Sequence, residues 1–466
     1  MIQRILIFMG LVTAVCCHAK PNVVYILADD LGYGETGYNG QQMIQTPELD
    51  ALAGRGMRFT AHYCGSSVCA PSRCALMTGK HPGHGYIRAN SPGYPNGQTP
   101  IPADSETLGK LMQRAGYKTA CIGKWGLGSP WNSGNPNQQG FDLFFGYCDQ
   151  RLAHNYYPQF LWRNGKKVQL GGKVYSHDLM TEEALGFLEE NKDNPFFLYL
   201  AYTIPHTKYQ VPNLGIYKDR DWPENMKTHA AMTSRMDRDV GRLMRRLEEL
   251  GLAENTLVMF NSDNGAHGEK GSEEFFNTSG ELRGIKRSMY EGGVRSPMFA
   301  YWPGTIKPGA VSGHLSAFWD MLPTLSQLTG EPIRGETDGI SMLPTLLGRP
   351  ENQRKHDYLY WELYEGVPNQ AVRMGKWKGV VVDRRKGQEI ELYDLSADEG
   401  EQRNVADEHP EVVERIRNAM NAAHTPSPFW SKDNRPLFNA PAACETTGAT
   451  YVPRKPKKKA ANRRVE

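Results

Sequence analysis

Short apolar runs alternate along this chain with longer stretches that have the periodicity of amphipathic helices, and this alternation limits the possible folds most strongly. Between the third and fourth runs, apolar residues recur on one helical face from Met232 to Leu250, and Gly251 follows as a helix stop. Strands that alternate with helices predict a largely parallel α/β sheet covered by helices on both faces. The four runs, rich in β-branched and aromatic residues, lie at 22–28, 117–122, 195–202 and 256–260.

The pattern changes after Glu351, where short amphipathic segments follow one another with turns between them. Four such segments lie at 356–362, 369–374, 377–382 and 391–395, and a helical pattern follows at 408–423. We therefore predict a large N-terminal domain over 20–346, a smaller α+β domain with an antiparallel sheet over 347–440, and a basic, disordered tail over 441–466. The segment 129–172, rich in Gly, Asn and aromatic residues, is predicted to lie outside the core.

The first nineteen residues have the pattern of a secretory signal peptide. Arg4 precedes an apolar run over 5–17, and the small residue Ala19 follows. The run is too short to span a membrane, so we predict cleavage near Ala19 and a periplasmic or secreted protein. A lipoprotein anchored at Cys16 or Cys17 is the alternative, although the residue before either cysteine matches that signal poorly. Later stretches are too short or too polar for a membrane-spanning helix.

Charge and cysteine content exclude several classes of protein. The formal net charge of +3 comes from the segment 451–466, which holds seven Lys or Arg residues and one Glu, so the rest of the chain carries about −3. We therefore expect no nucleic-acid partner. Two of the eight cysteines fall in the predicted signal peptide, and the sequence contains no Cys-x-x-Cys pair. A disulfide scaffold and a structural zinc site are both disfavoured.

Polar side chains directly follow each of the four predicted strands. Ligands of open α/β sheets bind beyond the carboxyl ends of the strands, so we expect these residues to converge from distant parts of the chain. The oxygen donors among them suit a hard cation such as Ca²⁺, and several carboxylates this close would not all stay ionised without one. Taken alone, each acidic pair is also typical of an ordinary turn. The residues are Asp29 and Asp30, Lys124, His206, and Asp263 and Asn264.

The segment 69–80 places a cysteine where a helix is expected to begin. Pro71 suits the first turn of a helix, and Arg73 lies about one turn after Cys69. Free N–H groups and the helix dipole favour an anion at this end. A nucleophilic thiol of low pKa and a buried structural cysteine are both compatible with this pattern alone.

The run Cys69-Ala70-Pro71-Ser72-Arg73, followed by Met77-Thr78-Gly79-Lys80, resembles the signature of the type I, arylsulfatase-like sulfatases. The resemblance implies an alkaline-phosphatase-like fold, with a large, mostly parallel sheet sandwiched by helices, and an enzyme that hydrolyses sulfate esters. It also implies that a formylglycine-generating or sulfatase-maturating enzyme oxidises Cys69 to formylglycine, whose hydrated aldehyde attacks the sulfur. Because the chain is predicted to be exported, we expect a sulfated polysaccharide or oligosaccharide as the substrate.

The same resemblance implies a role for each residue beyond the strand ends. His206 would protonate the departing alcohol as a general acid. The groups that match the cations balancing the sulfate charge are Arg73, Lys124 and Lys286, the last of these within the family-like segment 282–297. The groups that match the calcium ligands are Asp29, Asp30, Asp263, Asn264 and an oxygen of the modified Cys69.

The chain departs from the family pattern at one position near the nucleophile. Many relatives carry a histidine two residues after the lysine, against the formylglycine, where it is thought to assist sulfate expulsion; here this position is Gly126. His84 is a hypothetical substitute, because it follows the nucleophile segment. The candidates for binding the sugar are Arg88, Asn90 and His154, with Arg151, Tyr156 and Tyr157 beside them.

Three other functions stay open on the sequence alone. A phosphate or phosphonate monoester hydrolase of the same superfamily would share the metal, the arginine and the modified cysteine. A catalytically silent glycan-binding protein would account for the missing histidine. A thiol hydrolase would use the unmodified Cys69 and would be indifferent to chelators.

Overall fold

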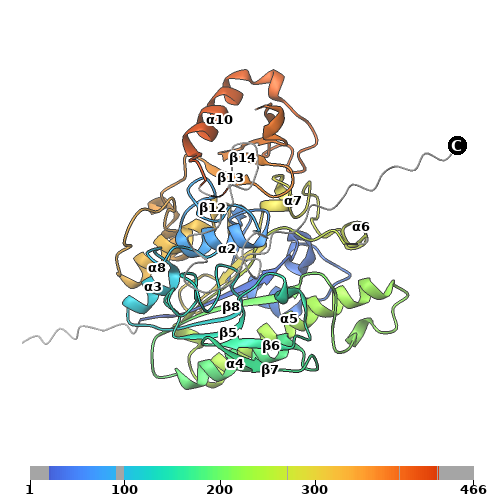
Figure 1. Ribbon diagram of the computed structural model, residues 1–466. Helices are drawn as coiled ribbons and strands as arrows, with labels where there is room; N and C mark the ends of the chain where they lie inside the picture. The colour runs from blue at the N-terminus through green and yellow to red at the C-terminus, as the bar shows by residue number, and fades with distance from the viewer. Residues whose placement is uncertain (1–19, 91–98, 270, 388, 428, 430–466) are drawn as a thin grey trace, which may run out of the picture.

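The computed structural model describes residues 20–90, 99–269, 271–387, 389–427 and 429. It contains a ten-stranded sheet in the larger part of the chain and a four-stranded sheet in the smaller C-terminal part, which lies at the top of Figure 1. The predicted signal peptide, 1–19, and the predicted disordered tail, 441–466, lie outside the described residues.

The large sheet is mixed and mostly parallel, which confirms the predicted α/β class. Its central neighbours β9, β1, β8, β4 and β5 run parallel, whereas β10 and β6 run antiparallel to the strands beside them. All eight residues of β1 are buried, as expected for a central strand covered on both faces. The strands in spatial order are β11 (Ala310–Ser312), β2 (Met57–Phe59), β10 (Met298–Tyr301), β9 (Thr256–Ser262), β1 (Asn22–Asp29), β8 (Phe196–Pro205), β4 (Lys118–Lys124), β5 (Leu143–Tyr147), β6 (Phe160–Arg163) and β7 (Lys166–Gln169).

Helices cover both faces of this sheet because alternate residues of each strand point to opposite sides. From β1, Val23, Tyr25 and Leu27 pack with α2, α3 and α8, whereas Val24 and Ile26 pack with α1, α4 and α5 on the other face. Each fully buried side chain of this kind contributes about 1.5–3 kcal/mol. The helices are α1 (Pro47–Arg55), α2 (Cys69–Thr78), α3 (Leu108–Arg114), α4 (Ser176–Glu190), α5 (Glu224–Glu249) and α8 (Met321–Thr329).

The smaller sheet is antiparallel, as predicted, and both of its faces are covered. Val372 and Val381 pack against α10, while Trp361 and Val380 join the core of the larger part. A buried ion pair also joins the two parts, with Lys378 Nζ 2.7 Å from Glu291 Oε1. The elements are β13 (Leu359–Leu363), β14 (Asn369–Met374), β15 (Trp377–Val381), β16 (Glu391–Asp394) and α10 (Pro410–Ala423).

The segment 129–172 was expected outside the core, and for β5 this prediction is wrong. β5 pairs with β4 as a parallel strand of the large sheet. The glycines that suggested a loop are instead needed for close packing, because a Cβ at Gly146 would lie 1.9 Å from the carbonyl oxygen of Gly123. A glycine-rich composition therefore concealed a buried strand.

Shorter elements complete the described chain. None of its helices combines the length and apolar character needed to cross a membrane. The cysteines of this part, Cys64, Cys69, Cys74, Cys121 and Cys148, are all buried and form no disulfide with one another. The short elements are β3 (His62–Tyr63) paired with β12 (Ser316–Ala317), α6 (Ser272–Phe276), α7 (Glu291–Val294) and α9 (Leu343–Leu346).

Candidate functional site

The carboxyl ends of four neighbouring strands meet at one place, as the strand-end pattern predicted. β1 lies between β8 and β9, and Asp29 pairs in register with Pro205, the residue before His206. Asp263 directly follows β9, and Lys124 ends β4 on the far side of β8. Asp30 adopts a left-handed backbone, φ 64°, immediately after β1. Such a strained turn in a non-glycine residue is typical of a functional site.

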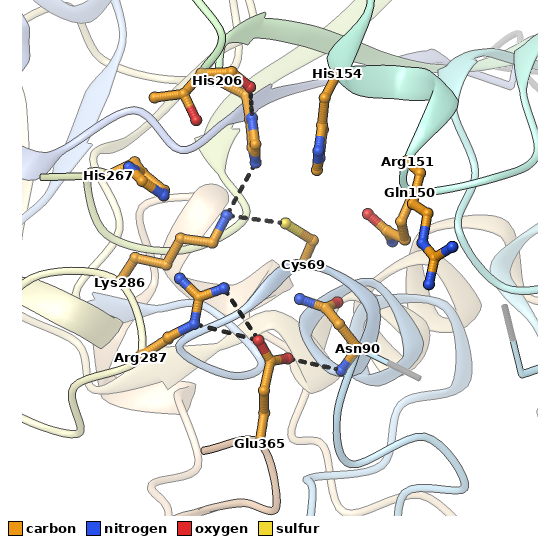
Figure 2. A pocket seen from close by; sticks show the side chains of 11 residues that line it. Cys69, Asn90, Gln150, Arg151, His154, His206, His267, Lys286, Arg287 and Glu365 are labelled. Carbon is orange, nitrogen blue, oxygen red and sulfur yellow. Dashed lines mark hydrogen bonds and ion pairs between the residues drawn. The ribbon is translucent and has the colours of Figure 1, made fainter. Parts of the chain in front are cut away.

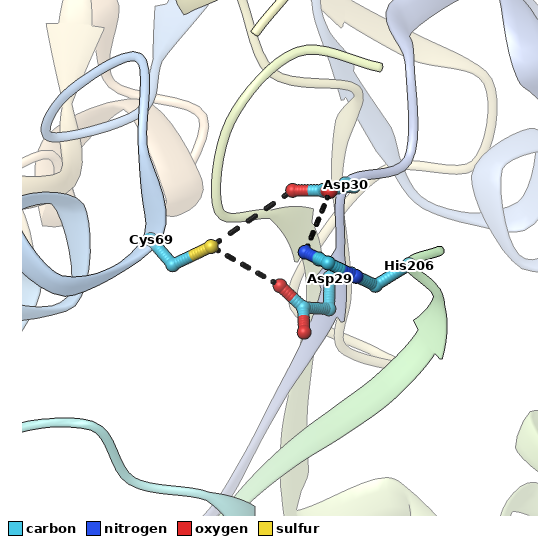
Figure 3. Close-up of side chains that lie close together, drawn as sticks. All are labelled: Asp29, Asp30, Cys69 and His206. Carbon is cyan, nitrogen blue, oxygen red and sulfur yellow. Dashed lines mark hydrogen bonds and ion pairs between the residues drawn. The ribbon is translucent and has the colours of Figure 1, made fainter. Parts of the chain in front are cut away.

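Cys69 begins helix α2 and points into this group of residues (Figure 3). Its Sγ lies 3.5 Å from Asp29 Oδ1 and 3.9 Å from Asp30 Oδ1. The helix start is held by Asn90, whose Oδ1 accepts the backbone N–H of Ala70 at 2.9 Å. Burial raises the pKa of the Cys69 thiol well above its ordinary value. This shift is opposite in direction to the lowered pKa of an activated nucleophilic thiol.

Three cationic side chains pair with the three aspartates. Arg73 Nη2 lies 2.7 Å from Asp263 Oδ2, and Lys124 Nζ lies 2.8 Å from Asp29 Oδ2. Lys286 Nζ donates to Asp30 Oδ1 at 2.6 Å and lies 3.4 Å from Cys69 Sγ. All of these groups are buried, so each charge is stabilised by its oppositely charged partner rather than by hydration.

The protonation of the aspartates follows from these pairs. Burial opposes ionisation of Asp30, but His206 and Lys286 beside it lower its pKa below the ordinary value. Burial and the neighbouring Asp29 raise the pKa of Asp263 to about 6, despite Arg73. The cationic partners therefore favour the ionised forms of Asp29 and Asp30, whereas burial and the nearby carboxylates oppose ionisation of Asp263.

This group of oxygens fits a hard cation. Asn264 is 1% exposed, its Nδ2 donates to Asp30 Oδ1 at 2.7 Å, and its Oδ1 has no hydrogen-bond partner among the described residues. Carboxylates with an unpartnered amide oxygen are the donors that Ca²⁺ prefers. Single ligand atoms from Asp29, Asp30, Cys69 and His206 also lie within 4.8 Å of one another.

A cavity of about 310 Å³ opens above Cys69 (Figure 2). His206 and Lys286 line it, whereas Arg73 and Lys124 are buried outside its lining. His206 Nε2 lies 3.1 Å from Asp30 Oδ2 and 3.2 Å from Lys286 Nζ, and its ring stacks on that of His154 at 3.7 Å. Burial and Lys286 lower the pKa of His206 to about 3, against the opposing effect of Asp30.

Two of the three candidates for sugar binding lie in this cavity, and one does not. Asn90 and His154 line it. Arg88 was predicted with them, but its buried guanidinium bonds to Glu362 Oε1 at 2.6 Å and to the carbonyl oxygen of Thr425. We therefore remove Arg88 from the substrate site, because it joins the loop after α2 to the C-terminal part instead.

His84 also lies elsewhere, so it does not replace the family histidine. Its Nδ1 lies 2.8 Å from Asp338 Oδ1, and it lines a different cavity beside Lys80 and Glu106. His84 is therefore close to Cys69 in sequence but does not line the same cavity.

Several lining residues escaped the sequence reasoning. Gln150 follows β5, the strand that was missed, and the strand-end rule would have found it had β5 been recognised. His267 lies just beyond the predicted Asp263 turn. Arg287 and Glu365 form a rim ion pair of 3.0 Å between the two parts of the chain, a contact for which the sequence gives no local signal.

Comparison with known proteins agrees with this architecture. A family model described as Sulfatase matches residues 21–331, and one described as N-sulphoglucosamine sulphohydrolase, C-terminal, matches residues 283–425. The chain is 33% identical to human arylsulfatase A, over 88% of this chain and 89% of that protein. It is 28% identical to an N-acetylgalactosamine-6-O-sulfatase of Bacteroides thetaiotaomicron, over 87% and 93% respectively.

A solved structure has a similar fold over most of the chain. The crystal structure of Ps i-CgsB in complex with k-i-k-neocarrahexaose has a TM-score of 0.77 and 31% sequence identity, covering 86% of this chain and 92% of that one.

Proposed function

Because this chain belongs to the sulfatase family and is a sulfuric ester hydrolase, we propose that it removes sulfate from a sulfated polysaccharide or oligosaccharide, using a formylglycine made from Cys69 and a bound calcium ion. The observation that carries this proposal is the position of Cys69, at a buried helix start beside Asp29, Asp30 and Lys286 and at the base of a cavity. Once formed, the formylglycine hydrate supplies the nucleophile that a buried thiol of raised pKa does not offer.

Calcium would be held by Asp29, Asp30, Asp263 and Asn264. The support is the set of oxygen donors and the unpartnered Oδ1 of Asn264. When bound, the ion supplies positive charge that attracts the sulfate group and favours an ionised oxygen beside it.

The chain's own cations have two different tasks in this proposal. Lys286 lines the cavity 3.4 Å from Cys69 Sγ, so its ammonium can donate to a sulfate oxygen seated there. Arg73 and Lys124 act through their partners, because they hold the carboxylates of Asp263 and Asp29 in place from below the cavity.

His206 would act as the general acid that protonates the leaving oxygen. Its Nε2 lies beside Lys286 Nζ at 3.2 Å, which puts both groups on one wall of the cavity. Burial and Lys286 lower the pKa of His206, and the negative charge of a bound sulfate would favour the protonated ring that a general acid requires.

The polar rim of the cavity supports a carbohydrate substrate. Asn90, His154, Arg151 and the Arg287–Glu365 pair offer several hydrogen-bonding groups around the opening, as sugar recognition requires. Two of the similar proteins named above are an N-acetylgalactosamine-6-O-sulfatase and a protein solved in complex with k-i-k-neocarrahexaose. In this assignment, domain 20–346 provides the reacting groups, and domain 347–440 closes the rim through Glu365.

Export through a signal peptide over 1–19, to the periplasm or outside the cell, completes the proposal. The support is the Arg4 and apolar-run pattern of the sequence. The expected partner within the cell is the enzyme that oxidises Cys69.

Hydrolysis of matched esters tests the function. Protein produced with a maturating enzyme should release nitrophenol from nitrophenyl sulfate far faster than from nitrophenyl phosphate, and a chelator should suppress it. A panel of sulfated galactose, galactosamine and glucosamine oligosaccharides then identifies the sugar. Cys69→Ala protein is the control for both. Preference for the phosphate ester would instead support a phosphate monoester hydrolase of the same superfamily.

A further inference from the structure

Gln150 places a buried carboxamide in the wall of the cavity. The residue is 7% exposed and lines the cavity together with Cys69. Neither Oε1 nor Nε2 has a hydrogen-bond partner within the described part of the chain. Figure 2 shows the carboxamide across the cavity from Lys286, on the opposite side of Cys69. Because a buried polar group without a partner is unfavourable, a group kept in this state points to a ligand that completes it.

The space for this carboxamide comes from Gly126. Gly126 has φ 78°, and a Cβ at this position would lie 2.2 Å from Gln150 Nε2. No side chain at position 126 therefore fits while Gln150 keeps its place. The sulfatase resemblance implies a histidine at position 126 in many relatives. The glycine found here is what leaves space for the Gln150 carboxamide in the cavity wall.

We propose that the Gln150 carboxamide contacts the sulfate group at residue 69 and takes over, as a binding group, the place of the histidine that Gly126 lacks. Its Nε2 donates to a sulfate oxygen from the wall facing Lys286. This inference rests on the proposed function and deepens it. A carboxamide neither gains nor loses a proton near neutral pH. Gln150 therefore holds and orients the sulfate group and does not transfer a proton.

Sulfate binding, measured apart from turnover, tests this role. In Cys69→Ala protein, which cannot be converted, adding Gln150→Ala should raise the dissociation constant for inorganic sulfate about 10- to 100-fold, the range for one hydrogen bond to a charged group. Isothermal titration calorimetry provides the measurement. In the matured enzyme, Gln150→Ala should lower kcat/KM for nitrophenyl sulfate by a similar factor. Gln150→Glu should lower it further, because a carboxylate repels the anion.

Gln139→Ala is the matched control. Gln139 is also buried, but its Nε2 donates to the carbonyl oxygens of Pro102 and Ser133, and it does not line the cavity. This variant should bind sulfate as its parent does, even if its melting temperature falls.

A swap separates contact from folding. Gly126→His alone should lower the melting temperature, because position 126 has φ 78° and its new Cβ would lie 2.2 Å from Gln150 Nε2. Adding Gln150→Gly removes the contact but not the backbone strain, so the double variant should recover sulfate binding and only part of the lost stability. If Gln150→Ala leaves the sulfate dissociation constant and kcat/KM unchanged in an enzyme that hydrolyses sulfate, the role of Gln150 is wrong and the proposed function stands. If the wild-type protein neither binds nor hydrolyses sulfate, the proposed function itself fails.

Discussion

Calcium is expected to stabilise this protein against heat, and the size of the effect follows from the site. Three buried carboxylates face three buried cations, so a divalent ion competes with Lys124 and Lys286 for Asp29 and Asp30. We therefore expect a modest dissociation constant of about 10 µM, within the range for exchangeable calcium sites. At about 1 mM free calcium, a hundredfold excess, the folded state gains about 2.7 kcal/mol. For a chain of this length, the melting temperature should rise by a few degrees.

Asn264→Ala isolates the site in this experiment. It removes the unpartnered Oδ1 without changing any formal charge. Differential scanning fluorimetry with EGTA, with CaCl₂ and with MgCl₂ should give a calcium-selective shift in the wild type that Asn264→Ala loses. Asn22→Ala is the matched control, because Asn22 is equally buried but lies at the opposite end of β1. Equal calcium shifts in wild type and Asn264→Ala would refute this assignment of the ligands.

Four further substitutions probe the remaining roles. Lys286→Met should lower kcat/KM by about 10²–10³-fold, as expected when a charged donor to the transition state is removed, and a loss below threefold in steady-state assays would exclude that role. His206→Ala should slow sugar sulfates far more than nitrophenyl sulfate, whose leaving group needs no proton; equal losses would exclude a general acid. Arg88→Met should lower the unfolding free energy by about 1.5–3 kcal/mol, measured in urea, because buried Glu362 loses a hydrogen-bond partner. KM should stay unchanged, because Arg88 does not line the cavity; a raised KM at unchanged stability would return Arg88 to the substrate site. His84→Ala should leave turnover unchanged, since its ring pairs with Asp338 outside the cavity; slower turnover would restore it as a candidate.

The central part of the site follows from local sequence because strand ends have a local signature. An apolar run that stops at Asp29-Asp30 or at Asp263-Asn264 marks both the strand and the polar end that the sheet brings together. The same is true of Cys69, since Pro71 and the residues around it define the helix start. The small antiparallel sheet could also be predicted from the sequence, because its four segments are short and separated by turns.

The parts that sequence reasoning missed depend on packing between distant segments. β5 looked like a loop because Gly146 serves a backbone approach to Gly123 rather than a turn. Missing β5 also concealed Gln150 at its end. Arg88 resembled a substrate ligand because its actual partner is distant in sequence. Glu362 lies 274 positions away and neutralises the guanidinium charge of Arg88. Glu365 reaches the cavity only because the smaller sheet packs against the larger part.

The measurement that bears most directly on the account is the rate of sulfate release against the fraction of residue 69 that has been converted. Preparations made with graded amounts of maturating enzyme would be analysed by peptide mass spectrometry across α2 and assayed in saturating calcium. The rate should be proportional to the converted fraction and should reach zero in fully thiol protein and in Cys69→Ala. Sulfate release that persists in Cys69→Ala, or that is unrelated to conversion, would contradict it.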